Sequence, residues 1–431
     1  MKTYVAELNK NIVYTTSNFK NIPQLNEISP HLMKEIEVIG SVLPFKVNSY
    51  YLNNLIDWGN VPNDPMFQLV FPNRKMIEEE DYIKLESSID TGDKALKKEL
   101  VENIIKKLNP HPGGQMELNV PIVEENALKG IQHKYNETVL FFPKEGQTCH
   151  NYCSYCFRWP QFVGDKALRF ESKETIELTN YLRSNPNITD VLITGGDPMI
   201  MNASKIMHYI SPLLEPEFDH IRNIRIGTKA LTYWPNRFIS DSDSEELLQF
   251  FKKIIDSGKS LAIMAHFTHW RELEAPLTQV AIKKIRDVGA IIRSQSPIIG
   301  HINNNPETWK ILWEKQVQLG IIPYYMFVER DTGSNRYFQV PLIEAYNIYR
   351  DAISRVSGLA RTARGPVMST TYGKIEVQGV IEILGVKYFT LRFLQARNID
   401  WINKPFLAKY SNKAMWIDQL EPAFEDKFFF Q

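Results

Sequence analysis

The sequence predicts an α/β protein built on a partial (β/α)6 TIM-like barrel, with an N-terminal helical extension and a C-terminal capping segment. Two observations carry this prediction. Short apolar runs rich in branched and aromatic residues recur along the middle of the chain, each about as long as a buried parallel strand. Helix-like segments separate these runs, and such alternation is typical of parallel β/α folds. The runs are residues 138–142, 190–194, 224–228, 261–266, 290–296 and 321–328.

The segments between the runs have features typical of helices. These are charged residues mixed with apolar residues at helical spacing, acidic residues in the first turn, or a proline near the start. They are residues 172–184, 243–257, 276–288 and 306–319. We therefore expect three regions: a mostly helical one over 1–125, the barrel over 126–330 and the capping segment over 331–431.

The two outer regions also contain segments that favour helices or strands. In the first, residues 30–43 and 93–108 favour helices. In the last, residues 373–393 indicate short antiparallel strands, which could cover the barrel mouth.

Composition narrows the functional class. The 431 residues contain 50 basic and 50 acidic side chains, so no net charge favours nucleic acid or an acidic membrane surface. No signal-peptide pattern and no apolar run of membrane-spanning length is present. All three cysteines lie within eight positions, which leaves none for disulfides and fits a reducing compartment. We expect a cytoplasmic protein without membrane or nucleic-acid partners.

The three cysteines are the main chemical signal. Cys149, Cys153 and Cys156 have C-x3-C-x2-C spacing and directly follow the first predicted strand. They should lie at the carboxyl end of the barrel, where β/α barrels carry their chemistry. Three thiolates can hold a [4Fe–4S] cluster and leave its fourth iron open. The alternatives are three inert buried thiols, or a zinc site completed by His150, which lies too close to Cys149 in the loop to reach the same ion easily.

A second motif closes the second predicted strand. Gly195 and Gly196 let the backbone approach a ligand closely, and amides there can bind a carboxylate. Asp197 and Pro198 follow. The alternative is an ordinary strand-to-helix turn.

Together the two motifs resemble the radical SAM superfamily. The resemblance implies that S-adenosylmethionine binds the open iron and yields a 5′-deoxyadenosyl radical that abstracts hydrogen from a substrate. It also implies that Gly195, Gly196 and Asp197 hold the methionine end of this cofactor. An electron donor such as flavodoxin or ferredoxin would then be required.

Within that superfamily the chain resembles the lysine 2,3-aminomutase family over about residues 43–368. This resemblance implies a small amino-acid-like substrate and an isomerase or another radical reaction. The sequence leaves a homo-oligomer open. The matching stretches are residues 61–65, 133–135, 149–164, 190–198, 225–228, 266–269, 295–296, 323–325 and 366–368.

The departures from the family concern pyridoxal phosphate. Arg364 stands where the family has its Schiff-base lysine, and an arginine cannot form an imine. Lys134 and Thr138 replace two arginines that hold the cofactor phosphate in the family. The family's aspartate that precedes its glycine run falls near Ser357 or Gly358, and neither of these residues is a carboxylate. We therefore expect a radical SAM enzyme that works without pyridoxal phosphate.

The family resemblance implies roles for further residues. Arg158 would hold the substrate carboxylate, and Asp331 or Glu329 the substrate amine, with Tyr325 lining the cavity. Each has a plain alternative: an ion pair near the cluster for Arg158, a solvated charge run for the acids and core packing for Tyr325. The residues implied near the adenosyl group are His266 and Gln295.

Two rival functions remain. The first is a pyridoxal-phosphate-dependent aminomutase with a displaced Schiff-base lysine, Lys374 or Lys229, although either side chain fits better as a solvated charge or a salt-bridge partner. The second is a non-catalytic iron–sulfur protein. The sequence does not identify the substrate, the product or the fate of the substrate radical.

Overall fold

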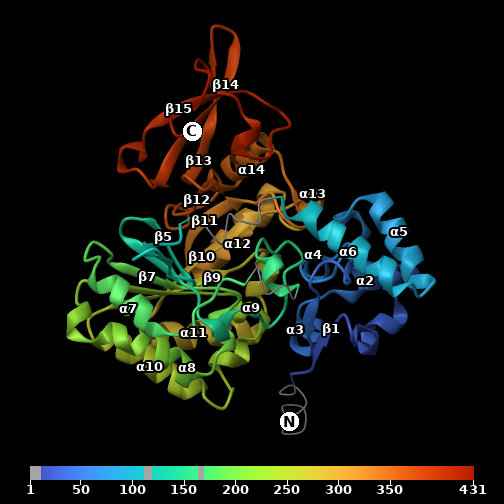
Figure 1. Ribbon diagram of the computed structural model, residues 1–431, viewed down its shortest axis with the longest axis horizontal. Coiled ribbons are helices and arrows are strands. Elements are labelled where there is room, and N and C mark those ends of the chain that lie inside the picture. The colour runs from blue at the N-terminus through green and yellow to red at the C-terminus, as the bar shows by residue number, and fades with distance from the viewer. Residues whose placement is uncertain (1–10, 111–118, 164–168) are drawn as a thin grey trace.

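The computed structural model describes residues 11–110, 119–163 and 169–431. An 11-stranded sheet forms its centre, with the strand order β15-β14-β13-β12-β11-β10-β9-β8-β7-β6-β5. This sheet curves through the middle of the molecule, and the N-terminal region lies against its side (Figure 1).

Seven consecutive strands of this sheet run parallel. They are β6 (Thr138–Phe141), β7 (Asp190–Ile193), β8 (Asn223–Thr228), β9 (Ser260–His266), β10 (Ile291–Ile298), β11 (Ile322–Val328) and β12 (Arg364–Ser369). The first six confirm the predicted runs and the partial-barrel class. The seventh was not predicted, because its sequence contains Gly365 and Pro366 and has no long apolar run.

Helices cover the outside of the parallel strands, as Figure 1 shows for the green and yellow segments. Four match the predicted helices: α7 (Thr175–Arg183), α10 (Ser244–Asp256), α11 (Pro276–Asp287) and α12 (Pro306–Gln318). The other helices of this part are α8 (Ala203–Ile210), α9 (Ala230–Tyr233), α13 (Asn335–Phe338) and α14 (Leu342–Ile353). The start of α12 illustrates the local cause, since Asn305 caps the helix through Thr308 N and Pro306 fixes the first turn.

The parallel strands bury one face more completely than the other. In β8, Ile224 and Ile226 are fully buried against the helices, whereas the alternate residues Asn223, Arg225 and Gly227 are half-buried. The burial in β7 and β10 alternates in the same way. Because side chains alternate across a strand, the half-buried set faces the barrel interior, which an incomplete barrel leaves open.

The N-terminal region has its own hydrophobic core, which continues into the loop that carries the cysteines. Tyr155, Trp159 and Tyr233 of the barrel belong to this core. The expected helices 30–43 and 93–108 are α2 and α6. The elements of this region are β1 (Val13–Thr15), α2 (Pro30–Ile39), β2 (Lys46–Asn48), α3 (Ser49–Asn54), α4 (Pro65–Gln68), α5 (Glu79–Asp90) and α6 (Lys94–Leu108).

The C-terminal strands lengthen the barrel sheet. The antiparallel strands expected over 373–393 are present as β13 (Gly373–Ile383) and β14 (Val386–Ala396), and β15 (Pro405–Lys409) follows them. β13 pairs antiparallel with β12, the last of the parallel strands, so these strands continue the wall of the barrel beyond residue 330.

At the other edge of the sheet, β5 (Ile131–Tyr135) pairs antiparallel with β6 and also contacts β14. The two ends of the open sheet therefore come together. A short hairpin, β3 (Ile122–Val123) and β4 (Asn126–Ala127), precedes β5.

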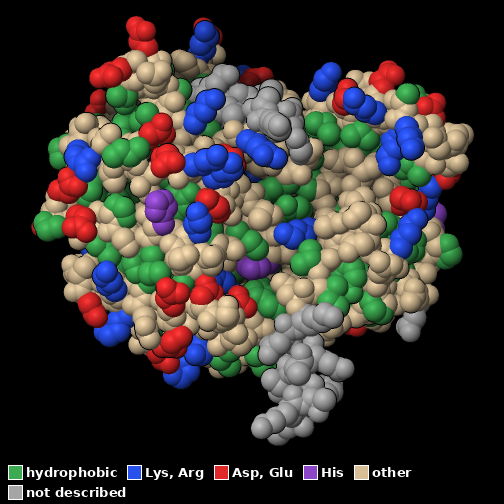
Figure 2. Space-filling view, turned by 60° about the horizontal axis from the view of Figure 1, so that its bottom comes forward, with side chains coloured by type: hydrophobic (Ala, Val, Ile, Leu, Met, Phe, Trp, Pro, Cys, Tyr) green, Lys and Arg blue, Asp and Glu red, His purple; other side chains and the backbone are tan. Residues whose placement is uncertain are grey.

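Acidic and basic side chains alternate over much of the face shown in Figure 2, in keeping with the balanced charge of the chain. Among the described residues, no helix combines the length and the apolar composition that crossing a membrane requires.

Candidate active site

The cysteine loop leaves the carboxyl end of β6 and is fixed by the N-terminal region. Tyr152 N donates to Lys46 O at 2.9 Å, and Ser154 N donates to Leu69 O at 2.9 Å. Lys46 Nζ in turn donates to the carbonyl oxygen of Cys149 at 2.6 Å. Backbone groups of the loop are therefore paired with Lys46 and Leu69 of the N-terminal region, which restrains the positions of the three thiols.

All three thiols are half-buried and lie close enough to affect one another. Burial raises the pKa of Cys149 well above its ordinary value, and the nearby Asp197, Cys156 and Cys153 add to this. Burial and Cys153 raise the pKa of Cys156 to about 12. Three thiolates gathered in this way need a compensating cation, so the donor set fits an iron–sulfur cluster.

A site for a single metal ion has a different geometry, because its ligands must converge on one point. Among the residues that the structure describes, no group of three His, Cys, Asp or Glu side chains is arranged to hold one ion. The cysteines of a cubane cluster bind three separate irons, so they need not converge on one point.

The Gly195-Gly196-Asp197 turn packs directly on the start of the cysteine loop. Asp197 N donates to Thr148 O at 2.8 Å. A Cβ atom on Gly196 would lie 2.6 Å from that same oxygen, so only glycine allows this approach. Gly195 has a φ of +150°, which also favours glycine.

The carboxylate of Asp197 is engaged within the protein. One oxygen accepts from Thr228 Oγ1 at 2.7 Å and from Met199 N at 2.9 Å, and the other accepts from Lys229 N at 2.9 Å. Despite these bonds, burial raises its pKa to about 6. The side chain joins the ends of β7 and β8, so its carboxylate oxygens are already engaged within the protein.

His266 and Gln295 come from neighbouring strands and are register partners in β9 and β10. His266 Nε2 lies 3.1 Å from the hydroxyl of Tyr155, and that hydroxyl also contacts Thr268 Oγ1 at 2.8 Å. Burial and the nearby Lys229 lower the pKa of His266 well below its ordinary value. The two predicted residues thus lie together, and Tyr155 connects them to the cysteine loop.

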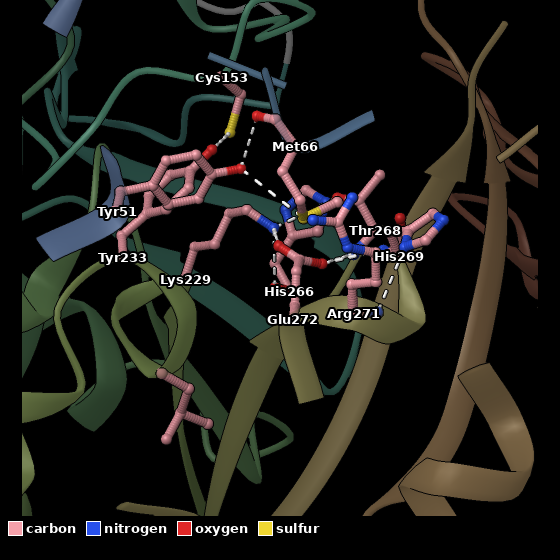
Figure 3. Close-up of polar contacts among 12 residues, drawn as sticks. Tyr51, Met66, Cys153, Lys229, Tyr233, His266, Thr268, His269, Arg271 and Glu272 are labelled. Carbon is pink, nitrogen blue, oxygen red and sulfur yellow. Dashed lines mark hydrogen bonds and ion pairs between the residues drawn. The ribbon is translucent and has the colours of Figure 1, made fainter. Parts of the chain in front are cut away.

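Lys229 forms a buried ion pair at the same end of the barrel (Figure 3). Its Nζ donates to Glu272 Oε1 at 2.5 Å, and it contacts Thr268 Oγ1 and the carbonyl oxygen of His266 at 3.2 Å each. Glu272 Oε2 accepts from His269 N at 2.9 Å. The three ammonium donors therefore all have partners, and Lys229 is a salt-bridge residue of the interior.

Arg158 is buried beside the cysteine loop, with only 8% of its surface exposed. Its guanidinium lies 4.6 Å from the ring centre of Phe142, and Nη2 donates to Gln147 Oε1 at 3.2 Å. Its Nε has no partner among the described residues. Burial lowers its pKa to about 10, although the thiols of Cys156 and Cys149 oppose this effect.

The acidic residues after β11 differ in their environments. Glu329 is buried, and neither carboxyl oxygen has a partner within the described part of the chain. Burial raises its pKa well above its ordinary value. Asp331 is half-buried and lies near Arg330. Glu329 is therefore the acid of this pair that is enclosed at the strand end.

No protein-family model matches the chain. It is 31% identical over 394 residues to an Aquifex aeolicus protein named "Putative L-lysine 2,3-aminomutase", a match that covers 91% of this chain and 92% of the relative. The chain belongs to the lysine 2,3-aminomutase family. The L-lysine 2,3-aminomutase of Haemophilus influenzae is 28% identical over 261 residues, which are 59% of this chain and 73% of that enzyme.

Among solved structures, a radical SAM methyltransferase from Sphaerobacter thermophilus overlaps with 56% of this chain and 68% of its own, at a TM-score of 0.37 and 15% identity.

Arg364 was expected at the position where the family resemblance implies a Schiff-base lysine. Arg364 lies at the start of β12, with its guanidinium 4.9 Å from the ring centre of Tyr325 and 5.1 Å from that of Tyr324. Tyr325 is buried, with 2% of its surface exposed. The position is thus occupied by a stacked cation that cannot form an imine.

Lys374 was expected to be a solvated charge or a salt-bridge partner, and the structure corrects this. It lies on β13 with Nζ 4.6 Å from the ring centre of Tyr325 and donates to Gln395 Oε1 at 2.6 Å. Burial, Arg225 and Arg364 lower its pKa to about 7. Sequence reasoning missed this environment because the neighbours of Lys374 come from distant strands.

Proposed function

We propose that this member of the family is a radical SAM enzyme that abstracts hydrogen from a small amino-acid-like substrate and works without pyridoxal phosphate. The observation that carries the proposal is the packing of the Gly195-Gly196 turn on the start of the cysteine loop, which joins the two motifs at one end of the barrel. When bound, a reduced [4Fe–4S] cluster and S-adenosylmethionine supply a 5′-deoxyadenosyl radical.

The residues of this chain would hold and enclose these groups. Cys149, Cys153 and Cys156 would each bind one iron. The backbone of Gly195 and Gly196 offers a close approach for the methionine end of the cofactor. His266 and Gln295, which lie side by side on the adjoining strands β9 and β10, would face the adenosyl group. The barrel wall would exclude water from the site.

Arg158 and the acids after β11 are suited to hold the substrate. The unpartnered Nε of Arg158 leaves its guanidinium able to receive a carboxylate in two hydrogen bonds. The burial of Glu329 supports it over Asp331 as the contact for the substrate amine. Burial raises the pKa of Glu329 above its ordinary value, which favours the neutral form of this carboxyl group.

The test is anaerobic reconstitution followed by incubation with S-adenosylmethionine, dithionite and a panel of deuterated amino acids. We expect iron and sulfide in the protein, and deuterium in the 5′-deoxyadenosine formed with one substrate. Cys153→Ala should lose both. Protein that lacks iron and sulfide after reconstitution would contradict the proposal, and a cluster that never yields 5′-deoxyadenosine would favour the non-catalytic iron–sulfur protein.

One observation favours a second candidate, a pyridoxal-phosphate-dependent aminomutase with Lys374 as the displaced lysine. The lowered pKa of Lys374 leaves much of its amine uncharged at neutral pH, as covalent attachment requires. Borohydride reduction after incubation with pyridoxal phosphate, followed by peptide mass spectrometry, tests this candidate. A phosphopyridoxyl group on Lys374, absent from Lys374→Arg and retained in Lys387→Arg, would establish it.

A further inference from the structure

Three basic residues form a group on the inner wall where the two ends of the open sheet meet. Lys374 Nζ lies 4.6 Å from the ring centre of Tyr325 and 5.4 Å from that of Tyr135. Lys134 Nζ also lies 5.4 Å from the Tyr135 ring, and the Arg364 guanidinium lies 4.9 Å from the Tyr325 ring. Three basic side chains from β5, β12 and β13 thus lie against two tyrosine rings. We call these three residues, Lys134, Arg364 and Lys374, the basic wall.

The basic wall has little negative charge of its own. Within the described part of the chain, none of its three residues forms an ion pair with a carboxylate. Lys374 donates to the Gln395 amide oxygen, and Lys134 donates to the Thr370 carbonyl oxygen. The carboxylate that acts on Lys374, Asp190, is already bound to Arg225 Nε at 2.7 Å.

The cations of the wall repel one another and their basic neighbours. Burial lowers the pKa of Lys134 well below its ordinary value, and Arg330, Lys374 and Arg397 lower it further. The charged forms of these half-buried side chains are costly without counter-ions, so an entering anion would stabilise them. All three side chains of the wall are half-buried and not fully enclosed, so they keep some exposed surface for a ligand.

We propose that the basic wall binds a second acidic group of the substrate, so that the substrate class is a dicarboxylic amino acid and not a basic one. This inference rests on the proposed function, in which Arg158 receives the first carboxylate. Arg364 supplies a planar fork suited to a carboxylate. Lys374 adds a basic group from the neighbouring strand β13, and Lys134 adds one from β5 at the opposite edge of the sheet.

The experiment is isothermal titration calorimetry on the reconstituted protein with S-adenosylmethionine. The ligands are L-aspartate, L-glutamate, L-2-aminoadipate, L-lysine and pyridoxal phosphate. We expect one dicarboxylic amino acid to bind at least about tenfold more tightly than L-lysine, since one added charge contact corresponds to about that factor. Arg364→Gln and Lys374→Met should each weaken this binding by about tenfold.

The matched control is Lys387→Met. Lys387 also lies over a tyrosine ring, at 5.9 Å from the centre of Tyr410, but it is exposed on the β13–β14 hairpin. Its substitution should leave the affinity unchanged.

A second readout does not depend on affinity. The charged groups near Lys374 are Lys134, Arg225, Arg364 and Asp190, and the rings of Tyr135 and Tyr325 lie against it. An anion bound beside them raises the pKa of Lys374, so the protein should take up a proton on binding at pH 7.5. The measured enthalpy should then depend on the ionisation enthalpy of the buffer, and this dependence should disappear in Lys374→Met.

Tighter binding of L-lysine, or dicarboxylate binding that neither substitution weakens, would overturn the inference. Stoichiometric binding of pyridoxal phosphate that is lost in Lys374→Met would also overturn it, because the wall would then serve that cofactor. Iron content and the yield of 5′-deoxyadenosine in the same preparations identify a failure of the proposed function separately, because the basic wall contains no cluster ligand.

Discussion

The phenol oxygen of Tyr233 lies 3.0 Å from the sulfur of Cys153. Tyr233 is held in place by the edge of the Tyr51 ring, at 5.4 Å between ring centres, and its carbonyl oxygen accepts a hydrogen bond from Asn48 Nδ2. A metal-bound thiolate has no proton, so the tyrosine must then be the donor. With Cys153 as a cluster ligand, this contact would give the protein a means of adjusting the cluster, because hydrogen bonds to ligand sulfurs influence the reduction potential.

We expect Tyr233→Phe to lower the reduction potential of the reconstituted cluster by tens of millivolts. The reduced cluster is the more negative state and gains more from the donated hydrogen bond. An anaerobic redox titration followed by electron paramagnetic resonance measures the change. Tyr410→Phe, at an exposed position, is the control. An unchanged potential in Tyr233→Phe would show that the contact is not retained when metal is bound.

Gly196→Ala should impair assembly of the site. Its Cβ would meet the backbone of Thr148 at 2.6 and 2.7 Å, so the cysteine loop would have to move. Such crowding costs about 1 to 3 kcal/mol, and we expect a lower melting temperature and less iron per chain. Gly358→Ala is the control, since a Cβ atom there has no neighbour within 4 Å. Equal iron content in the two variants would argue against the close approach.

Removal of one partner of the Lys229–Glu272 pair should be more damaging than removal of both. Glu272 is fully buried, so Lys229→Met leaves an uncompensated charge and should cost about 3 to 5 kcal/mol. Lys229→Met combined with Glu272→Gln should recover part of this loss. Thermal unfolding of the three proteins measures the effect, and a double variant less stable than Lys229→Met would contradict it.

The stability of the protein should rise with pH because of Lys374. Its pKa is about 7 in the folded protein and near 10.5 when unfolded, so the unfolded state binds more protons between these values. The penalty for charging Lys374 is complete below about pH 7 and disappears as the pH approaches 10.5. Lys374→Met should therefore raise the melting temperature at pH 7 but not at pH 10. A difference in melting temperature between the two proteins that stays the same over this pH range would show that Lys374 is exposed to solvent.

Local sequence was sufficient for the cysteines and for six strands, because short spacing and apolar runs are properties of adjacent residues. It was insufficient for β12, which contains Gly365 and Pro366 and is placed by the pairing of Arg364 and Val367 with β11 and of Val367, Met368 and Ser369 with β13. Strands over 373–393 could be predicted, but their place in the sheet depends on pairing with β12. Pairing of this kind cannot be predicted from adjacent residues in the sequence.

The same limit applies to the site. The residue types and their spacing pointed to Cys149 and Gly196, and the family resemblance pointed to Arg158. They did not predict that Lys374 would be enclosed by the rings of Tyr135 and Tyr325, because these three residues are separated by up to 239 positions and are brought together by the folded sheet.

The hydrogen bonds from Tyr152 to Lys46 and from Ser154 to Leu69 have a practical consequence. A shortened protein that begins at the barrel would retain every thiol, yet the backbone partners that shape their loop would be gone. The metal-binding unit of this enzyme is therefore larger than the segment that supplies its ligands, and chimeras with other barrels would have to exchange both parts together.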